Sequence, residues 1–132
     1  MTMSMTLQTA QQHIAKAIEK ANNDYKRPIC VAVCDAYGFL IAFARQDGAP
    51  IRSIEISRRK AFTAVRMGVS TAAFFARLQK DNLLASYFGD DMLPLPGGNV
   101  IKEGDTVVGG IGISGLAANE DQEIANAVTA GA

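Results

Sequence analysis

The stretch from residue 29 to residue 49 constrains the fold most strongly, because one turn separates two apolar runs there. The first run is rich in valine, and the second contains Phe39, Ile41 and Phe43, residue types that suit a pleated, half-buried surface. Residues 35–38 supply the turn, since Asp can bond to the backbone two residues further on and Gly accepts a positive φ. The stretch therefore predicts an antiparallel β-hairpin.

Four helices are predicted from hydrophobic periodicity and from capping residues. Apolar residues recur at three- and four-residue spacing over residues 7–23, which is typical of an amphipathic helix with one apolar stripe. A second helix is expected over residues 53–68, with Ser53 as its N-cap, and a third over residues 70–80. The last helix is expected to begin at the N-cap Asn119, with Gln122 in the capping-box position.

Two further strands are expected near the C-terminal third of the chain. Turn residues at 94–98 and 102–105 bracket a short strand at 99–101 and a longer strand at 106–114, whereas residues 81–95 are expected to form a loop with short helical turns. Strands that are joined by tight turns cannot be parallel neighbours. The chain of 132 residues is therefore predicted to form one α+β domain, 1–132, an antiparallel sheet built from two hairpins and flanked by helices.

The second predicted helix carries apolar residues on two faces. One face holds Ile54, Ala61, Phe62 and Val65, and the other holds Ile56, Thr63, Ala64 and Met67. A surface helix of a monomer needs only one apolar stripe. We therefore expect a homo-oligomer, in which a partner chain or a ligand covers the second face.

Charge and hydropathy exclude several kinds of partner. The formal net charge is zero, and the basic residues between Arg52 and Arg66 lie on one short stretch, which makes no case for a nucleic-acid partner. No apolar run is long enough to span a bilayer, and the first residues lack the positive and apolar regions of a secretory signal. We expect a soluble, cytoplasmic protein with no membrane partner.

Two features that often mark functional sites, a pair of cysteines and a glycine-rich segment, are interpreted here as structural. Cys30 and Cys34 lie on one strand roughly 13 Å apart, too far for a disulfide, and are expected to be small core residues. Residues 110–115 match the letters G-x-G-x-x-G, but a dinucleotide site needs a βαβ unit and an acidic residue about twenty positions further on. Glycines that let another backbone pack closely on a central strand are the better explanation.

Five polar residues remain as candidates for a site. Arg45, Asp47, Glu55 and Lys60 lie at the mouth of the first hairpin and on the helix behind it. They form either solvated ion pairs or the polar groups of a pocket that binds a carboxylate and moves a proton. His13, the one histidine, falls at the edge of the first helix's apolar stripe, where it leans toward a groove or points at solvent.

Several motifs are more specific together than any one of them is alone. They are the run Val31 to Gly38, the tripeptide Asp47-Gly48-Ala49, the segments Ser53 to Ser57 and Lys60 to Ala64, the turn Pro96-Gly97-Gly98, and the segment Val108 to Gly115 with Asp121. Over nearly the whole chain this set resembles the GlcG/HbpS family of small domains. The family's Arg-Met-Asp-Gly-Ala motif reads Arg45-Gln46-Asp47-Gly48-Ala49 here, so a polar residue replaces an apolar one.

The resemblance implies an antiparallel sheet flanked by helices and assembly as homodimers or larger rings, commonly octamers. HbpS members of the family bind haem. The related C-terminal domain of PduO-type corrinoid adenosyltransferases binds haem or cobalamin through a histidine of its first helix. His13 is the only candidate for that histidine here.

The resemblance thus implies a non-catalytic or accessory domain that binds haem or a cobalamin-like tetrapyrrole, with His13 as the iron ligand. The other candidate cofactor-binding residues are Arg45, Asp47, Glu55, Lys60 and Gly98. The tetrapyrrole is expected to pack on residues such as Ile14, Ile56 and Met67, with its propionates near Arg45, Arg52 or Lys60. The alternative is an enzyme or accessory subunit that acts on a small hydroxy acid, aldehyde or diol.

Overall fold

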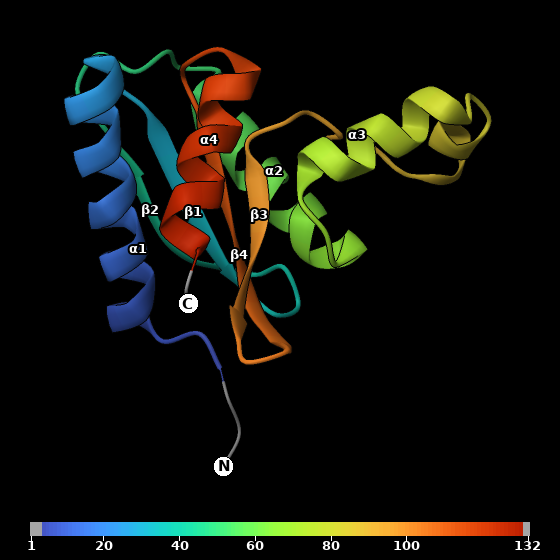
Figure 1. Ribbon diagram of the computed structural model, residues 1–132, viewed down its shortest axis with the longest axis horizontal. Coiled ribbons are helices and arrows are strands. Elements are labelled where there is room, and N and C mark those ends of the chain that lie inside the picture. The colour runs from blue at the N-terminus through green and yellow to red at the C-terminus, as the bar shows by residue number, and fades with distance from the viewer. Residues whose placement is uncertain (1–3, 131–132) are drawn as a thin grey trace.

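The computed structural model describes residues 4–130, which form a layered α+β domain (Figure 1). A four-stranded sheet contains β1 (Cys30–Asp35), β2 (Leu40–Arg45), β3 (Gly98–Glu103) and β4 (Thr106–Ser114) in the order β2-β1-β4-β3, and every neighbouring pair is antiparallel. Helices α1 (Leu7–Lys20) and α4 (Ala118–Thr129) cover one face, and α2 (Ser53–Met67) covers the other. Helix α3 (Thr71–Lys80) extends away from the sheet (Figure 1). The predicted fold class is confirmed.

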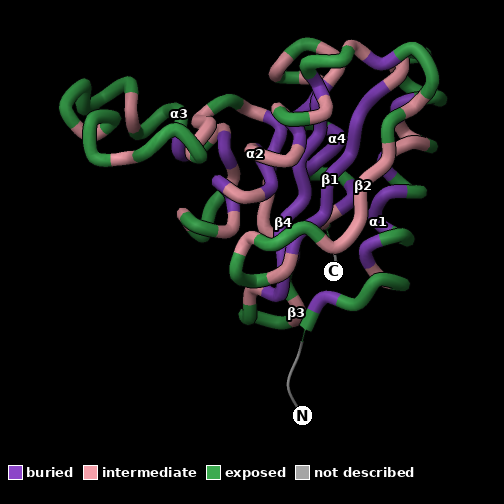
Figure 2. Tube along the Cα trace, turned by 180° about the vertical axis from the view of Figure 1, so that it is seen from behind, coloured by how far each residue is buried: buried purple, intermediate pink, exposed green. Residues whose placement is uncertain are grey.

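The main hydrophobic core lies between the sheet and the layer formed by α1 and α4. Alternate residues of a strand point to opposite faces, and Val31 and Val33 of β1 and Ile111 and Ile113 of β4 point into this core. Small residues of α1, such as Ala17, let the helix approach the sheet closely. Figure 2 shows that β1 and β4 form the buried centre of the molecule.

The other face of β4 carries glycines on which α2 packs directly. A Cβ atom at Gly112 would overlap the carbonyl oxygen of Ser57, and one at Gly110 would lie 2.7 Å from the carbonyl oxygen of Ala61. Neither position has room for a side chain, because the backbone of the helix lies against the backbone of the strand. The prediction that these glycines allow close backbone packing is confirmed.

Both cysteines are free and buried in the sheet, as predicted. Burial raises the pKa of the Cys34 thiol to about 12, and burial also raises the pKa of Cys30. A thiol with a raised pKa stays protonated near neutral pH and is a poor nucleophile and metal ligand. The two residues therefore contribute to packing rather than to chemistry.

The second apolar face of α2 contacts the segment that follows α3. Thr63 is fully buried, and its hydroxyl accepts a hydrogen bond of 2.8 Å from the backbone N–H of Leu93. The guanidinium of Arg59 donates to the carbonyl oxygen of Asp90 in the same segment. The segment also contains a 3₁₀ turn at Leu84–Tyr87, as expected for a loop with short helical turns. Part of the second face is thus covered within the chain, so this face alone does not require a partner.

The boundaries of α1 and α4 differ slightly from the prediction. Helix α1 continues into a π-helical turn at Ala21–Tyr25. The N-cap of α4 is Ala117, not Asn119, and the carboxylate of Glu120 accepts the N–H of Ala117 at 3.0 Å. The capping-box residue is therefore Glu120 and not Gln122. The side-chain amide of Gln122 instead bonds to the backbone of Gly97 and Gly98.

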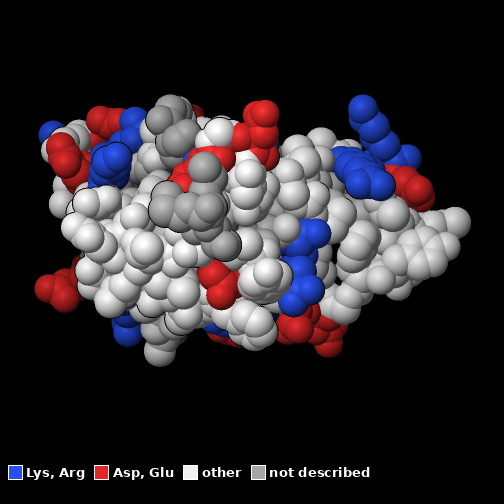
Figure 3. Space-filling model, turned by 90° about the horizontal axis from the view of Figure 1, so that it is seen from below, with Lys and Arg blue, Asp and Glu red and all other residues white. Residues whose placement is uncertain are grey.

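The surface carries charges of both signs. Figure 3 shows Lys and Arg interspersed with Asp and Glu over the face in view. Elsewhere on the surface, charged residues also form ion pairs, such as Arg27 with Glu120. A nucleic-acid site usually needs a broad area of positive charge. Within residues 4–130, no helix is long and apolar enough to cross a membrane.

Candidate functional site

A buried ion pair lies where α2, β4 and α4 meet. Lys60 is 1% exposed and Asp121 is 2% exposed. The Lys60 Nζ atom lies 3.2 Å from Asp121 Oδ2 and donates to the carbonyl oxygen of Ile113 at 2.8 Å. The second carboxylate oxygen, Oδ1, accepts the N–H of Leu116 at 3.1 Å. Burial lowers the pKa of Lys60 and raises the pKa of Asp121, because desolvation disfavours both charged forms, while each partner opposes the shift of the other.

Replacing Asp121 by Asn should destabilise the protein by about 3 kcal/mol at neutral pH, because it leaves the Lys60 charge buried without a counter-charge. Urea unfolding measures the loss. This loss of stability should become smaller as pH rises toward about 10. Because burial lowers the pKa of Lys60, the unfolded chain then binds more protons than the folded variant, and stability increases with pH.

The matched control is Asp24→Asn. Asp24 forms a surface ion pair with Lys20, and its side chain is 50% exposed, so its loss should cost less than about 1 kcal/mol. Equal losses of unfolding free energy in the two variants would show that the buried ion pair stabilises the fold no more than the exposed one.

A cavity of about 140 Å³ opens over this ion pair. Arg52, Ser53, Lys60, Ser114 and Asp121 provide its polar groups. The rest of the wall consists of Ile56, Leu95, Gly115, Leu116 and Ala118. Ser53 was predicted to cap α2, but the N-cap is Arg52 and the Ser53 side chain makes no capping bond, because the helical turn begins one residue earlier.

The structure does not gather the four polar residues predicted around the first hairpin. Only Lys60 lines the cavity. Glu55 is exposed and bonds to Arg58 on its own helix at 2.6 Å, whereas Arg45 donates to a backbone carbonyl at 3.3 Å. Asp47 lies exposed in the loop after β2. Among the described residues, no hydrogen bond or ion pair joins any two of the four.

Gly98, another predicted site residue, is held by side chains from two helices. Its N–H donates to the Thr71 hydroxyl at 2.8 Å, and its carbonyl accepts from the Gln122 amide at 3.0 Å. The same Gln122 side chain accepts the N–H of Gly97 at 2.7 Å. Both polar groups of Gly98 are thus used by the fold.

His13 occupies the inner side of α1 and is 7% exposed. Its Nδ1 atom lies 2.9 Å from the carbonyl oxygen of Thr9. A carbonyl oxygen only accepts hydrogen bonds, so Nδ1 is the donor, and in the neutral ring Nε2 then carries the lone pair. This tautomer lets Nε2 bind a metal ion.

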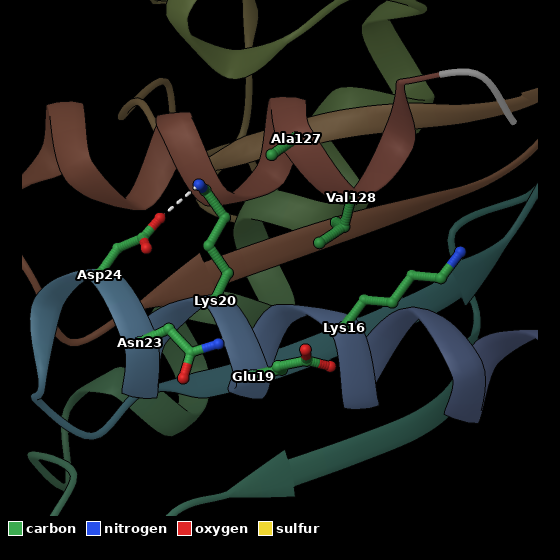
Figure 4. Close-up of a pocket in the computed structure, with 7 residues that line it drawn as sticks. All are labelled: Lys16, Glu19, Lys20, Asn23, Asp24, Ala127 and Val128. Atoms are coloured by element: carbon green, nitrogen blue, oxygen red, sulfur yellow. Dashed lines mark hydrogen bonds and ion pairs between the residues drawn. The ribbon is translucent and has the colours of Figure 1, made fainter.

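A groove of about 350 Å³ runs between α1 and α4 (Figure 4). It is lined by Lys16, Glu19, Lys20, Asn23, Asp24, Ala127 and Val128. The ammonium group of Lys20 bonds to the carboxylate of Asp24 at 2.6 Å. Residues three or four apart on a helix are neighbours, so His13 continues the line of Lys16 and Lys20 by one turn.

The sheet separates the apolar residues that were expected to hold one tetrapyrrole. Ile14 lies in the core between α1 and the sheet, whereas Ile56 and Met67 belong to α2 on the opposite face. Lys60, expected near a propionate, is paired with Asp121 and faces a cavity of only about 140 Å³, which is too small for a tetrapyrrole. One tetrapyrrole bound to a single chain can therefore contact only one of the two apolar groups.

A larger hollow, of about 610 Å³, lies between α3 and α4. It is lined by Ala72, Phe75, Leu95, Pro96, Ala118, Asn119, Gln122, Glu123 and Asn126. None of these lining residues is a histidine, lysine or arginine. The hollow therefore offers neither a nitrogen ligand for iron nor a cation for a carboxylate.

A model of the family described as "Haem degrading protein HbpS-like" matches residues 5–130. The chain belongs to the HbpS-like family. Two solved structures of similar proteins agree with this assignment. HbpS from Streptomyces reticuli, crystallised as a double mutant, is 32% identical with a TM-score of 0.88, covering 98% of the HbpS-like chain and 88% of its own. The PduOC:heme complex is 27% identical with a TM-score of 0.87, covering 97% and 94%.

One curated relative is the corrinoid adenosyltransferase PduO of Citrobacter freundii. It is 28% identical over 131 residues, which is 97% of the HbpS-like chain but 39% of PduO. The HbpS-like chain thus spans well under half the length of the curated relatives that it matches.

Sequence reasoning missed the role of Asp121. From the sequence, Asp121 is only one of the acidic residues in the first turn of the last helix, and nothing in the spacing links it to Lys60, 61 positions earlier. One signal was available: Lys60 shares a helix face with Ser57 and Ala64, small residues that indicate close packing. A lysine on such a face needs a buried partner.

Proposed function

We propose that this chain binds haem in an accessory role, with His13 as an iron ligand. The observation that carries the proposal is the similarity in fold, over nearly the whole chain, to the PduOC:heme complex. The family description, "Haem degrading protein HbpS-like", also refers to haem.

His13 has the chemistry that an iron ligand needs. The bond from Nδ1 to Thr9 holds the ring in place and leaves the Nε2 lone pair for iron, and such a bond increases the basicity of the ligand. The ring is 7% exposed, so an iron–nitrogen bond there would be shielded from water. Entry of haem requires the side chains that cover the ring to part.

The groove between α1 and α4, which begins about one helical turn along α1 from His13, offers one ammonium group, unpaired among the described residues, to a propionate. Lys16 forms no ion pair among residues 4–130, and it extends along the groove (Figure 4). Ammonium groups bind carboxylates through charge-assisted hydrogen bonds. Haem bound there would supply a redox-active iron whose absorption reports its axial ligands.

A haem titration followed at the Soret band tests this proposal. Saturation near one haem per subunit or per dimer is expected, whereas a linear increase without saturation would overturn haem binding. A parallel titration with cobalamin distinguishes the two tetrapyrroles, and we expect weaker binding because cobalamin is bulkier on both faces of its ring.

We further propose that the chain forms homo-oligomers. Strand β2 lies at the edge of the sheet, and apolar residues near its start are exposed, with Phe39 at 68% and Leu40 at 49%. Exposed apolar side chains on an unpaired edge favour association with another chain.

Light scattering coupled to size-exclusion chromatography should give a mass that is a multiple of 14.0 kDa. Leu40→Lys should lower this mass, because it places a charge on the proposed interface. Leu83→Lys is the control, since Leu83 is 74% exposed in the loop after α3 and its replacement should leave the mass unchanged. A mass of one chain for the unmodified protein would contradict association.

A further inference from the structure

We propose that the cavity over Lys60 and Asp121 is a second binding site, which takes a monocarboxylate of two or three carbons. The cavity lies among α2, β4 and the start of α4, whereas the groove near His13 lies between α1 and α4. The two sites share no lining residue. The inference therefore does not depend on haem binding.

Positive charge converges on this cavity. Lys60 and Arg52 line it, and Asp121 is the one acid among the lining residues, so one positive charge is left over. The N-terminal ends of α2, of 15 residues, and α4, of 12 residues, also border it. The N-terminus of a helix carries a partial positive charge and favours anions. A ligand with a single negative charge would balance the site.

Two buried hydroxyl groups of the cavity have no partner in the described protein. Ser53 is 1% exposed and Ser114 is 5% exposed, yet neither hydroxyl forms a hydrogen bond with residues 4–130. Neither oxygen is fully enclosed, since no enclosed side-chain polar atom among the described residues lacks a partner, and both residues line the cavity. Both hydroxyls can therefore donate to a carboxylate in the cavity.

Lys60 adds a further donor. An ammonium group has three N–H bonds, and the fold uses two of them, toward Ile113 and Asp121. The third N–H is available to a bound ligand. Asp121 can in turn accept a hydrogen bond from a hydroxyl of the ligand, which favours a hydroxy acid such as glycolate.

The size of the cavity limits the ligand. Its volume is about 140 Å³, which is the room that about five water molecules occupy at roughly 30 Å³ each. Glycolate and lactate have a comparable number of non-hydrogen atoms. A tetrapyrrole is far too large for the same space.

Isothermal titration of the full chain with glycolate tests the proposal. We expect saturable binding with one site per chain and a rise in melting temperature that grows with glycolate concentration. Arg52→Gln should weaken binding about tenfold, because it removes a charge-assisted hydrogen bond. Ser114→Ala should weaken it about fivefold without lowering the melting temperature of the free protein, since that hydroxyl has no hydrogen-bond partner among residues 4–130.

Arg77→Gln is the charge-matched control, since Arg77 is exposed on α3, outside the cavity, and the variant should bind glycolate normally. Absence of saturable binding would overturn the proposal, as would equal affinities of the unmodified protein and both cavity variants. Tighter binding of inorganic phosphate than of glycolate, lost in the same variants, would overturn the carboxylate class. The Soret titration is a separate readout, so failure of haem binding and failure of this site are distinguishable.

Discussion

Replacing His13 by Ala should abolish the low-spin spectrum of the ferric haem complex and weaken haem binding at least about 100-fold. His13 is the only histidine in the chain, so no second imidazole can take over as ligand. The measurement is a Soret titration of the variant beside the unmodified protein. Addition of free imidazole should restore the low-spin spectrum, because the small ligand can occupy the space that the side chain leaves.

Gln12→Ala is the matched control for this variant. Gln12 precedes His13 on the same helix and is exposed, so its replacement should leave the spectrum unchanged. Circular dichroism of both variants separates loss of the ligand from loss of the fold. An unchanged spectrum of folded His13→Ala would remove His13 as the ligand.

Replacing Gly112 by Ala should cost about 4 kcal/mol or more, a loss that few single substitutions reach. The new Cβ would overlap the carbonyl oxygen of Ser57 and lie 2.7 Å from the backbone N of Ala61. Both contacts are with backbone, which cannot rotate away as a side chain can. Helix α2 must therefore move off the sheet, and its movement disrupts the packing of β4.

Urea unfolding measures this loss, and Gly89→Ala is its control. A Cβ at Gly89 would meet nothing within 4 Å, so that substitution should change the free energy of unfolding by less than about 1 kcal/mol. Similar stability of the two variants would contradict the direct packing of the α2 backbone on the β4 backbone.

Local patterns predicted the elements, because their causes lie within a few residues. The carboxylate of Asp35 accepts the N–H groups of Tyr37 and Phe39, the turn chemistry that the first hairpin was expected to use. The Ser70 hydroxyl accepts the N–H of Ala73 and caps α3, which begins where the third helix was expected. Such contacts span two to four positions, so sequence alone can reveal them.

Contacts between distant segments could not be predicted in the same way. The pairing of β1 with β4 joins Cys30 to Ser114, and no local signal selects that neighbour. The two apolar faces of α2 were interpreted as evidence for a partner, but Leu93 and its neighbours cover part of one face. The ion pair of Lys60 with Asp121 likewise depends on how the finished fold brings two helices together.

The location of the haem iron tests the proposed site most directly. Crystals grown with haem can be measured at the iron absorption edge, and the anomalous difference map then locates the metal. We predict one iron peak per bound haem within coordination distance of His13 Nε2, beside the groove between α1 and α4. An iron peak elsewhere, such as in the hollow between α3 and α4, would contradict His13 as the ligand.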